Sequence, residues 1–146
     1  MPSGRKPFEI LLVEDNPGDV ILTQEAFREG EFPHRLSVAE DGEEAIRFLR
    51  REDGFRNAPR PDLILMDLNL PKKDGRELLA EVKSDPLLGQ IPVIVLTMSE
   101  ADQDIARAYR LHANCYLTKP IRMDEFLRMM RSIEDFWLNL ARLPLQ

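Results

Sequence analysis

Five polar residues stand at the ends of short apolar runs, and their types together suit phosphoryl chemistry. They are Glu14, Asp15, Asp67, Thr97 and Lys119. Three clustered carboxylates repel one another, and a divalent cation such as Mg²⁺, which prefers oxygen ligands, removes that repulsion. A carboxylate can also form an aspartyl phosphate, which makes Asp67 a possible nucleophile. Lys119 would supply positive charge, and Thr97 would supply a hydrogen bond to a phosphoryl oxygen.

Each of these residues also has an ordinary structural explanation when it is taken alone. Asp15 stands near a helix start, where acids are common, and Asp67 could be a turn residue. Thr97 could simply end a strand, and Lys119 could be a solvated surface charge. If all of these separate explanations were true, suitable residues would have come to stand at the ends of four apolar runs by four independent coincidences. The combined pattern therefore favours one shared site.

The apolar runs before these residues predict the strands of a parallel sheet. Five stretches have the length and composition of strands: residues 8–15, 34–41, 62–67, 91–97 and 114–120. Most are apolar on both faces, which is typical of parallel strands covered by helices on both sides. Ligands of such open sheets bind outside the carboxyl ends of the strands, and the five polar residues stand at those ends.

Helical patterns alternate with the predicted strands. Pro17 suits the first position of a helix that is capped by Asn16. The other helices are predicted over residues 43–52, 75–84, 102–112 and 123–143. Five alternations of strand and helix predict a doubly wound α/β fold with right-handed crossovers. We expect one domain over residues 8–143, a flexible tail over residues 1–7, and no separate output domain.

Composition narrows the classes of partner. The chain has 146 residues, a formal net charge of -6 and a single cysteine, Cys115. The negative charge argues against nucleic acid or an anionic membrane as the partner, because phosphate binders concentrate positive charge. No internal disulfide can form, which suits a reducing compartment, and no apolar run reaches the roughly 20 residues needed to cross a bilayer. A cytoplasmic location is therefore expected.

Four stretches resemble the receiver domain of two-component response regulators: "LLVEDNPGD", "LILMDLNLPKKDG", "VIVLT" and "YLTKP". The resemblance runs from about Phe8 to the final helix. It implies a flavodoxin-like (βα)5 fold with the strand order 2-1-3-4-5. It also implies that a histidine kinase phosphorylates Asp67 in a reaction that depends on Mg²⁺ or Mn²⁺. The protein would then be a phosphoacceptor that signals by protein contact or phosphorelay, and not an enzyme.

The resemblance also implies roles for the residues around Asp67. The implied metal ligands are Glu14, Asp15, Asp67 and the backbone carbonyl of Asn69. Lys119 would contact the phosphoryl group, while Thr97 and Tyr116 would be the switch residues, with Tyr116 turning inward. Met98 stands where the family usually has a small residue, and its long thioether would narrow the access of small phosphodonors. Pro120 matches a peptide bond that is usually cis in the family.

Two other functions fit part of the same pattern. A Mg²⁺-dependent phosphatase of the haloacid-dehalogenase type would also use Asp67 as its nucleophile. Such enzymes usually place a second Asp two residues later, where this chain has Asn69, which cannot protonate a leaving group. A flavin-binding flavodoxin-like protein should have a hydroxyl-rich phosphate loop after the first strand. Here that loop is the acidic "EDNPGD".

The last predicted helix carries an apolar stripe that continues past the expected end of the sheet. Exposed apolar patches of this kind often mark interfaces. We therefore expect a homodimer or a kinase-docking surface built from the last helix and strand. Its expected contact residues are Tyr116, Phe126, Met130, Phe136, Trp137 and Leu140.

Three further features resemble a subgroup of the receiver family. These features are the segment "EDNPGD" near the start of the chain, the long loop before "DLILMDLNLP", and the tail "FWLNLARLP". These features resemble the small single-domain regulators that partner bacterial and cyanobacterial phytochrome histidine kinases. A phytochrome kinase is therefore the expected phosphodonor.

Overall fold

A computed structural model of the chain describes residues 7–144, so most of the predicted N-terminal tail lies outside the described residues. Five parallel strands form one sheet in the order β2-β1-β3-β4-β5. The strands are β1 (Phe8–Val13), β2 (His34–Ala39), β3 (Leu63–Met66), β4 (Val93–Thr97) and β5 (Cys115–Thr118). The predicted strand order and fold class are confirmed.

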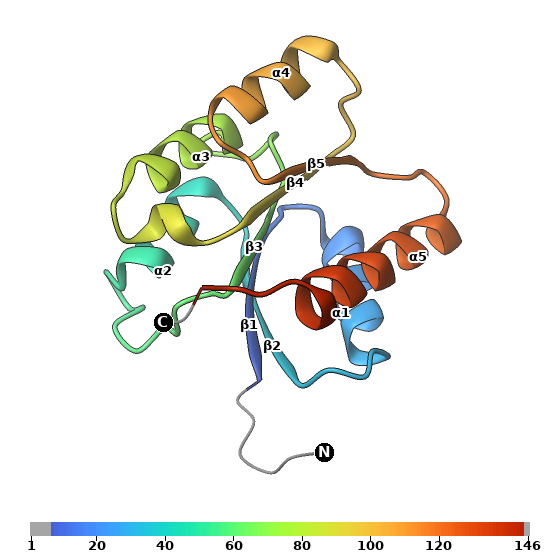
Figure 1. The fold of residues 1–146 in the computed structure, drawn as a ribbon. Helices are drawn as coiled ribbons and strands as arrows, with labels where there is room; N and C mark the ends of the chain where they lie inside the picture. Colours follow the sequence, from blue (N-terminus) through green and yellow to red (C-terminus); the bar gives the residue numbers. More distant parts are fainter. Residues whose placement is uncertain (1–6, 145–146) are drawn as a thin grey trace.

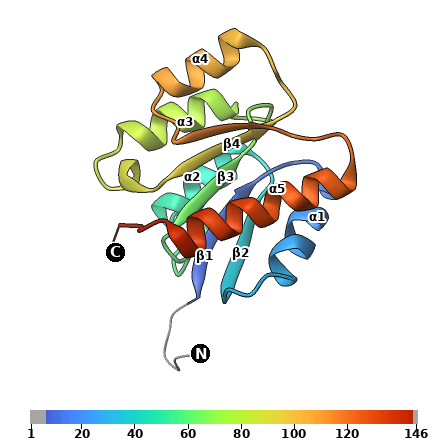
Figure 2. The ribbon, with the colours of Figure 1, turned by 45° about the vertical axis from the view of Figure 1, so that its right-hand side comes forward.

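Helices cover both faces of the sheet (Figure 1). One face carries α1 (Pro17–Arg28) and α5 (Met123–Ile133), and the other carries α2 (Gly42–Arg50), α3 (Gly75–Ser84) and α4 (Asp102–Arg110). A short 3-10 helix, η1 (Leu88–Gln90), precedes β4. Figure 2 shows α1 and α5 side by side over β1 and β2. No helix within residues 7–144 is both long and apolar enough to span a membrane.

The central strands divide the core into two layers. Every residue of β3 and β4 is buried, as their unbroken apolar runs predict. Because successive side chains of a strand point to opposite faces, Ile64 packs in the cluster under α2 and α3, and Leu65 packs in the cluster under α1 and α5. Burying one such aliphatic side chain contributes roughly 1.5–3 kcal/mol to the free energy of folding. Because many such side chains are buried on both faces, the sheet is a firmly packed support for the residues at its edge.

Three helices begin at a side-chain cap. Asn16 accepts from the N–H of Asp19 at the start of α1, and Pro17 takes the first helical position. Asp41 caps α2, and Asp74 caps α3. These caps satisfy N–H groups that have no partner inside a helix. The predicted start of α1 is therefore confirmed, and the three caps fix where each helix leaves the carboxyl edge of the sheet.

The C-terminal segment differs from the continuous α-helix predicted over residues 123–143. The α-helix ends at Ile133, and a π-helix, η2 (Glu134–Leu140), follows. A π-helix uses bonds between residues five apart, so the buried apolar side chains here are those of Ile133 and Leu138. Trp137 is half-buried against the core instead of facing solvent. The predicted spacing of three and four residues is wrong for this segment because its turns are wider.

Candidate functional site

The carboxyl ends of four strands bring the five predicted residues to one edge of the sheet, here called the rim. Glu14 and Asp15 follow β1, Asp67 follows β3, Thr97 ends β4, and Lys119 follows β5. Backbone hydrogen bonds extend the sheet into these loops. The Asp67 N–H donates to the carbonyl of the last residue of β1 at 3.1 Å, and the Lys119 N–H donates to the Thr97 carbonyl at 2.7 Å.

Three of the rim residues form a group with the chemistry of a cation site. Glu14, Asp15 and Asp67 each offer a carboxylate oxygen, and these oxygens lie within 4.8 Å of one another. Glu14 and Asp67 are buried, whereas Asp15 is exposed, so the group opens to solvent on one side. Oxygen ligands of this kind suit Mg²⁺ or Mn²⁺, and the donor set therefore fits the implied metal. The N–H of Asn69 donates to Asp67 at 3.2 Å.

Lys119 is the cation at the centre of these acids. Its ammonium donates to Glu14 at 2.6 Å, to Asp19 at 2.8 Å and to Asp67 at 3.0 Å. Burial opposes the charge on Lys119, but the hydrogen bonds to Asp19 and Glu14 outweigh it and raise the pKa of Lys119. The lysine stays charged and ready to neutralise an anion. Asp19 was not predicted from the sequence, although its place in the acidic "EDNPGD" loop was a signal.

Burial, with a smaller contribution from the neighbouring charge of Asp67, raises the pKa of Glu14 to about 7. The ammonium of Lys119 and the N–H of Asn16, which donates to Glu14 at 3.1 Å, act in the opposite direction. Burial is therefore the main obstacle to ionisation of Glu14, and repulsion from Asp67 adds to it. A divalent cation bound to these carboxylates would favour their charged forms, as expected from the residue types.

Thr97 is fully buried, and its hydroxyl has no hydrogen-bond partner among the described residues. Leaving a buried hydroxyl unpaired costs roughly 1–3 kcal/mol, and such groups deserve a functional explanation. A hydroxyl at the end of β4 with a free donor can bond to a phosphoryl oxygen at the rim. The position of Thr97 therefore suits the role that the resemblance implies.

Tyr116 points from β5 toward the loop between β4 and α4. Its hydroxyl donates to the carbonyl of Ser99 at 2.9 Å, and burial raises its pKa. The hydroxyl of Ser99 donates to Asp104 at 2.6 Å, and Asp104 also accepts from Arg76 at 2.9 Å. These bonds connect the predicted switch tyrosine to α3 and α4. Neither Arg76 nor Asp104 was predicted from the sequence, because their contact depends on how α3 and α4 pack.

The structure bears on two further positions of the family pattern. Met98 has an exposed fraction of 64%, so its thioether extends into solvent. The bond between Lys119 and Pro120 is trans, since no cis peptide bond occurs among residues 7–144. The trans form is the more stable one for most X–Pro bonds.

Gly75 allows the start of α3 to lie against the strand end that carries Asp67. A Cβ at this position would overlap the Asp67 carbonyl oxygen and would lie 2.6 Å from the Cα of Leu68. The Gly75 N–H donates to the Leu68 carbonyl at 2.9 Å. The turn "LPKKDG" therefore ends in glycine because any side chain would displace the backbone of the candidate nucleophile.

The residues predicted to form an interface divide into three groups. Phe126 and Met130 are 2% and 1% exposed and belong to the core under α5. Their prediction as contact residues does not fit, because they face the sheet and not the surface. Tyr116 and Trp137 are half-buried. Phe136 and Leu140 are exposed, as a contact surface requires, and the ring of Phe136 packs edge-on against Trp137.

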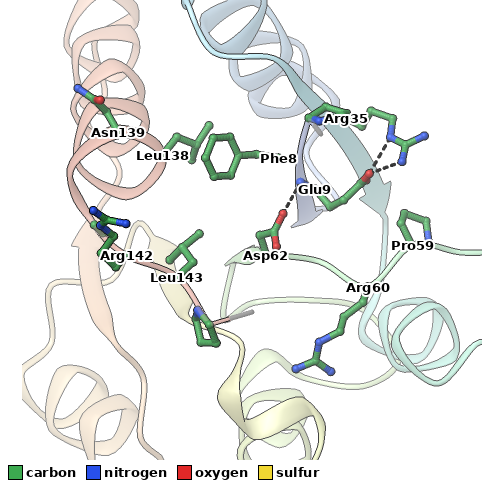
Figure 3. A pocket seen from close by; sticks show the side chains of 13 residues that line it. Phe8, Glu9, Arg35, Pro59, Arg60, Asp62, Leu138, Asn139, Arg142 and Leu143 are labelled. Atoms are coloured by element: carbon green, nitrogen blue, oxygen red, sulfur yellow. Dashed lines mark hydrogen bonds and ion pairs between the residues drawn. The ribbon is translucent and has the colours of Figure 1, made fainter. Parts of the chain in front are cut away.

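A cavity of about 830 Å³ lies at the opposite edge of the sheet from the rim (Figure 3). It is bounded by the starts of β1 and β2, the residues before β3, and the chain after Leu138. Within it, Glu9 pairs with Arg35, and the Glu9 N–H donates to Asp62 at 2.9 Å. None of the five rim residues lines this cavity. The candidate chemistry therefore lies at the rim and not in this cavity.

Comparison of the sequence with known protein families gives the same class of protein as the residues of the site. The sequence matches the model of the response regulator receiver domain over residues 10–131. That span includes most of β1, the other four strands, the helices up to most of α5 and every rim residue. The chain therefore belongs to the family of response regulator receiver domains, and the predicted class of protein is confirmed.

Three relatives place the chain within this family. Response regulator Rcp1 of Synechocystis sp. (strain PCC 6803) is 49% identical over 138 residues, which cover 94% of each chain. The crystal structure of the Mn²⁺-bound form of response regulator Rcp1 has a TM-score of 0.92 at 48% identity and covers 95% of this chain and 100% of that chain. The phosphorylated cyanobacterial phytochrome response regulator RcpA has a TM-score of 0.93 at 51% identity, with coverage of 96% and 100%. The probable methanogenesis regulatory protein FilR2 of Methanothrix harundinacea is 43% identical and covers 94% of this chain and 88% of its own.

Proposed function

We propose that Asp67 accepts a phosphoryl group from a histidine kinase. The observation that carries this proposal is the convergence of Asp67 with two further carboxylates and the Lys119 ammonium at one edge of the sheet. In the transfer, the bond between phosphorus and the kinase histidine nitrogen breaks, and a bond to a carboxylate oxygen of Asp67 forms. The product is an aspartyl phosphate. The chain acts as an acceptor and signalling partner, in the cytoplasm, and not as a turnover enzyme.

The rim residues would have different roles in the phosphoryl transfer. Glu14, Asp15, Asp67 and the backbone carbonyl of Asn69 would hold Mg²⁺ or Mn²⁺. The bound ion would neutralise charge on the transferring group. The ammonium of Lys119, already 3.0 Å from Asp67, would bond to a phosphoryl oxygen. Most of the catalysis in phosphoryl transfer comes from such positioning and charge neutralisation.

Thr97 and Tyr116 would pass the change to the surface. Phosphorylation adds roughly -1.5 to -2 charges, and the unpaired hydroxyl of Thr97 would bond to one of the new oxygens. Movement of Thr97 shifts the loop whose Ser99 carbonyl accepts from Tyr116. The loop and α4 would then favour a different arrangement, which a partner protein reads.

A phytochrome histidine kinase is the proposed phosphodonor. The support is the likeness to RcpA, a cyanobacterial phytochrome response regulator, with 51% identity and nearly complete coverage of both chains. FilR2, whose name refers to methanogenesis, is similar over the same length. The kinase specificity is therefore tested against kinases with and without a phytochrome sensor.

Phosphotransfer from a radiolabelled kinase tests the acceptor role. We expect wild-type protein to take up label from a phytochrome kinase in the presence of MgCl₂ and to lose this ability with a chelator. D67N should take up none, because the amide cannot form the acyl phosphate. Label that persists in D67N would contradict the assignment of Asp67. Sustained turnover of phosphomonoesters would support the phosphatase alternative instead.

We also infer that the chain forms a homodimer through η2 and its surroundings. Phe136 and Leu140 have exposed fractions of 52% and 65% and stand four residues apart on η2. Trp137 is half-buried beside Phe136 and would extend the apolar contact. Exposed apolar side chains gathered on one segment often mark an interface.

Light scattering of a double variant tests the dimer. F136S/L140S should shift the mass from dimer to monomer, because both changes remove exposed apolar contacts and leave the buried Leu138 in place. I21S is the matched control, since Ile21 is 58% exposed on α1, and its mass should stay unchanged. A monomeric wild-type protein at all concentrations would refute the dimer.

A further inference from the structure

Among the described residues, Asp19 is the acceptor of Lys119 that lies outside the candidate metal group. The Lys119 ammonium lies 2.8 Å from Asp19, and its other acceptors are Glu14 at 2.6 Å and Asp67 at 3.0 Å. A lysine ammonium has three N–H donors, so these carboxylates engage all of them. Glu14 and Asp67 belong to the group that fits a divalent cation, and Asp19 does not.

The backbone of Asp19 is fixed on both sides. Its N–H donates to the side chain of Asn16 at 3.1 Å, and its carbonyl accepts from the hydroxyl of the buried Thr23 at 2.8 Å. The Asp19 carboxylate can therefore move only by rotation of its own side chain. Its place in the first turn of α1 also favours a negative charge, because the N-terminus of a helix is positive. Asp19 is thus a fixed anchor point for a cation.

Binding of a cation and phosphorylation would both change how the two other acceptors, Glu14 and Asp67, interact with Lys119. Glu14 and Asp67 would turn oxygens toward a bound cation, and phosphorylation makes one oxygen of Asp67 the bridge of an acyl phosphate. Asp19 keeps both of its oxygens in each of these states. On the basis of the phosphoacceptor role proposed for Asp67, we propose that Asp19 is a positioning residue. It holds the Lys119 ammonium at the rim while the other two N–H groups turn to the phosphoryl oxygens.

A different role for Asp19 would have the opposite effect. If Asp19 mainly repelled the incoming phosphoryl anion or drew Lys119 away from Asp67, removal of its charge would speed the transfer with any replacement. Asn and Ala at this position separate the two roles. Both remove the charge, but only Asn keeps an oxygen that can accept from Lys119.

The test compares D19N with D19A in the full chain. We expect D19A to take up phosphoryl from a labelled kinase roughly tenfold more slowly than D19N, because a hydrogen bond to a charged donor is lost. Calorimetry with MgCl₂ and no phosphodonor gives a second readout. D19A should bind Mg²⁺ more weakly than D19N, since Lys119 without its anchor stays bound to Glu14 and Asp67. D19E, which restores a carboxylate, should recover part of both properties.

Equal uptake rates and equal Mg²⁺ affinities in D19N and D19A would overturn the proposal, and so would faster uptake in both. Circular dichroism establishes that each variant is folded. If D19A unfolds, D19S replaces it, because serine is favoured at helix starts and its hydroxyl ends one bond short of the carboxylate oxygens. If wild-type protein takes up no label, the role of Asp67 fails, and the Mg²⁺ affinities still decide the role of Asp19.

Discussion

Within residues 7–144, two regions of the molecule bury a glutamate, but only one of them provides a hydrogen-bonded cation for its carboxylate. At the rim, Glu14 is 3% exposed, and its carboxylate accepts from Lys119 at 2.6 Å. Beside the end of α1, Glu134 of η2 is 6% exposed, and its Oε2 has no hydrogen-bond partner among the described residues. Burial raises the pKa of both glutamates. The rim gives its buried acid a partner cation, as a site for charged groups requires, whereas Glu134 has no hydrogen-bonded cation.

A glycine allows close contact in both regions. A Cβ on Gly75 would overlap the backbone of Asp67, and a Cβ on Gly30 would overlap the carboxylate of Glu134. Backbone at the rim cannot rotate away, whereas the carboxylate is the end of a flexible side chain. The rim should therefore tolerate less change than the contact between Gly30 and Glu134. Substitutions in both regions test this difference.

The largest effect is expected when the rim loses its cation. K119M leaves Glu14 and Asp67 buried without an ammonium partner, and breaking a buried ion pair costs about 3–5 kcal/mol. We expect the free energy of unfolding to fall by this amount in urea titrations with a chelator present. Added MgCl₂ should restore more stability to K119M than it adds to wild-type protein, because the ion replaces the missing charge at the same carboxylates.

Lys83 provides a matched control for that variant. Its ammonium also has three acceptors, but all are neutral: the carbonyls of Gly89 and Ile91 and the side-chain oxygen of Asn114. K83M should cost roughly 1.5–3 kcal/mol, because its hydrogen bonds have a charged donor but no charged acceptor, and MgCl₂ should not restore it. Equal losses in K83M and K119M, with no response to MgCl₂ in either, would contradict a special role for charge at the rim.

The two glycines provide the next comparison. G75A should reduce the free energy of unfolding by about 3 kcal/mol, because overpacking against backbone forces a shift of the chain. G30A should cost about 1 kcal/mol, since the Glu134 side chain can rotate away. Urea titrations of both variants give these values. A loss in G30A as large as in G75A would show that Glu134 is held as firmly as the rim backbone.

The rim could be predicted from sequence because its parts are local. Asp67 and Thr97 each end an apolar run, and parallel strands place their carboxyl ends at one edge. The β-strand pattern and the cap at Asn16 are equally local, and both appear in the structure. A short pattern was therefore enough to predict the fold and the position of five rim residues.

The missed contacts join residues far apart in the chain. Asp19 and Lys119 are separated by 100 positions, and their contact depends on the rotation of α1 about its axis. The meeting of Gly30 with Glu134 depends on how the end of α1 packs against the end of α5. The change from α-helix to π-helix after Ile133 was also missed. An apolar pattern with spacings of three and four carries no sign of bonds between residues five apart. Packing between distant elements decides both contacts.

The smallest effect is expected at Glu134 and has the opposite sign. E134Q should raise the free energy of unfolding by about 1 kcal/mol at neutral pH, because a buried carboxylate with one unpaired oxygen becomes a neutral amide. The gain should depend on pH. Burial raises the pKa of Glu134 above its ordinary value of 4.5, although His34, the backbone N–H of Phe32 and Arg131 act against burial. Below pH 4.5 the carboxyl is protonated in the folded and unfolded chains, so wild-type protein and E134Q should be equally stable.

As the pH rises above 4.5, the unfolded chain loses the Glu134 proton first, and the stability of wild-type protein falls relative to E134Q until the folded chain has also ionised. Urea titrations of the pair from about pH 3 to about pH 8, a range that begins below the ordinary pKa of the carboxyl, measure this difference. A constant difference across that range would mean that Glu134 is ionised as easily in the folded protein as in solution. Its burial would then be compensated, and the contrast with Glu14 would disappear.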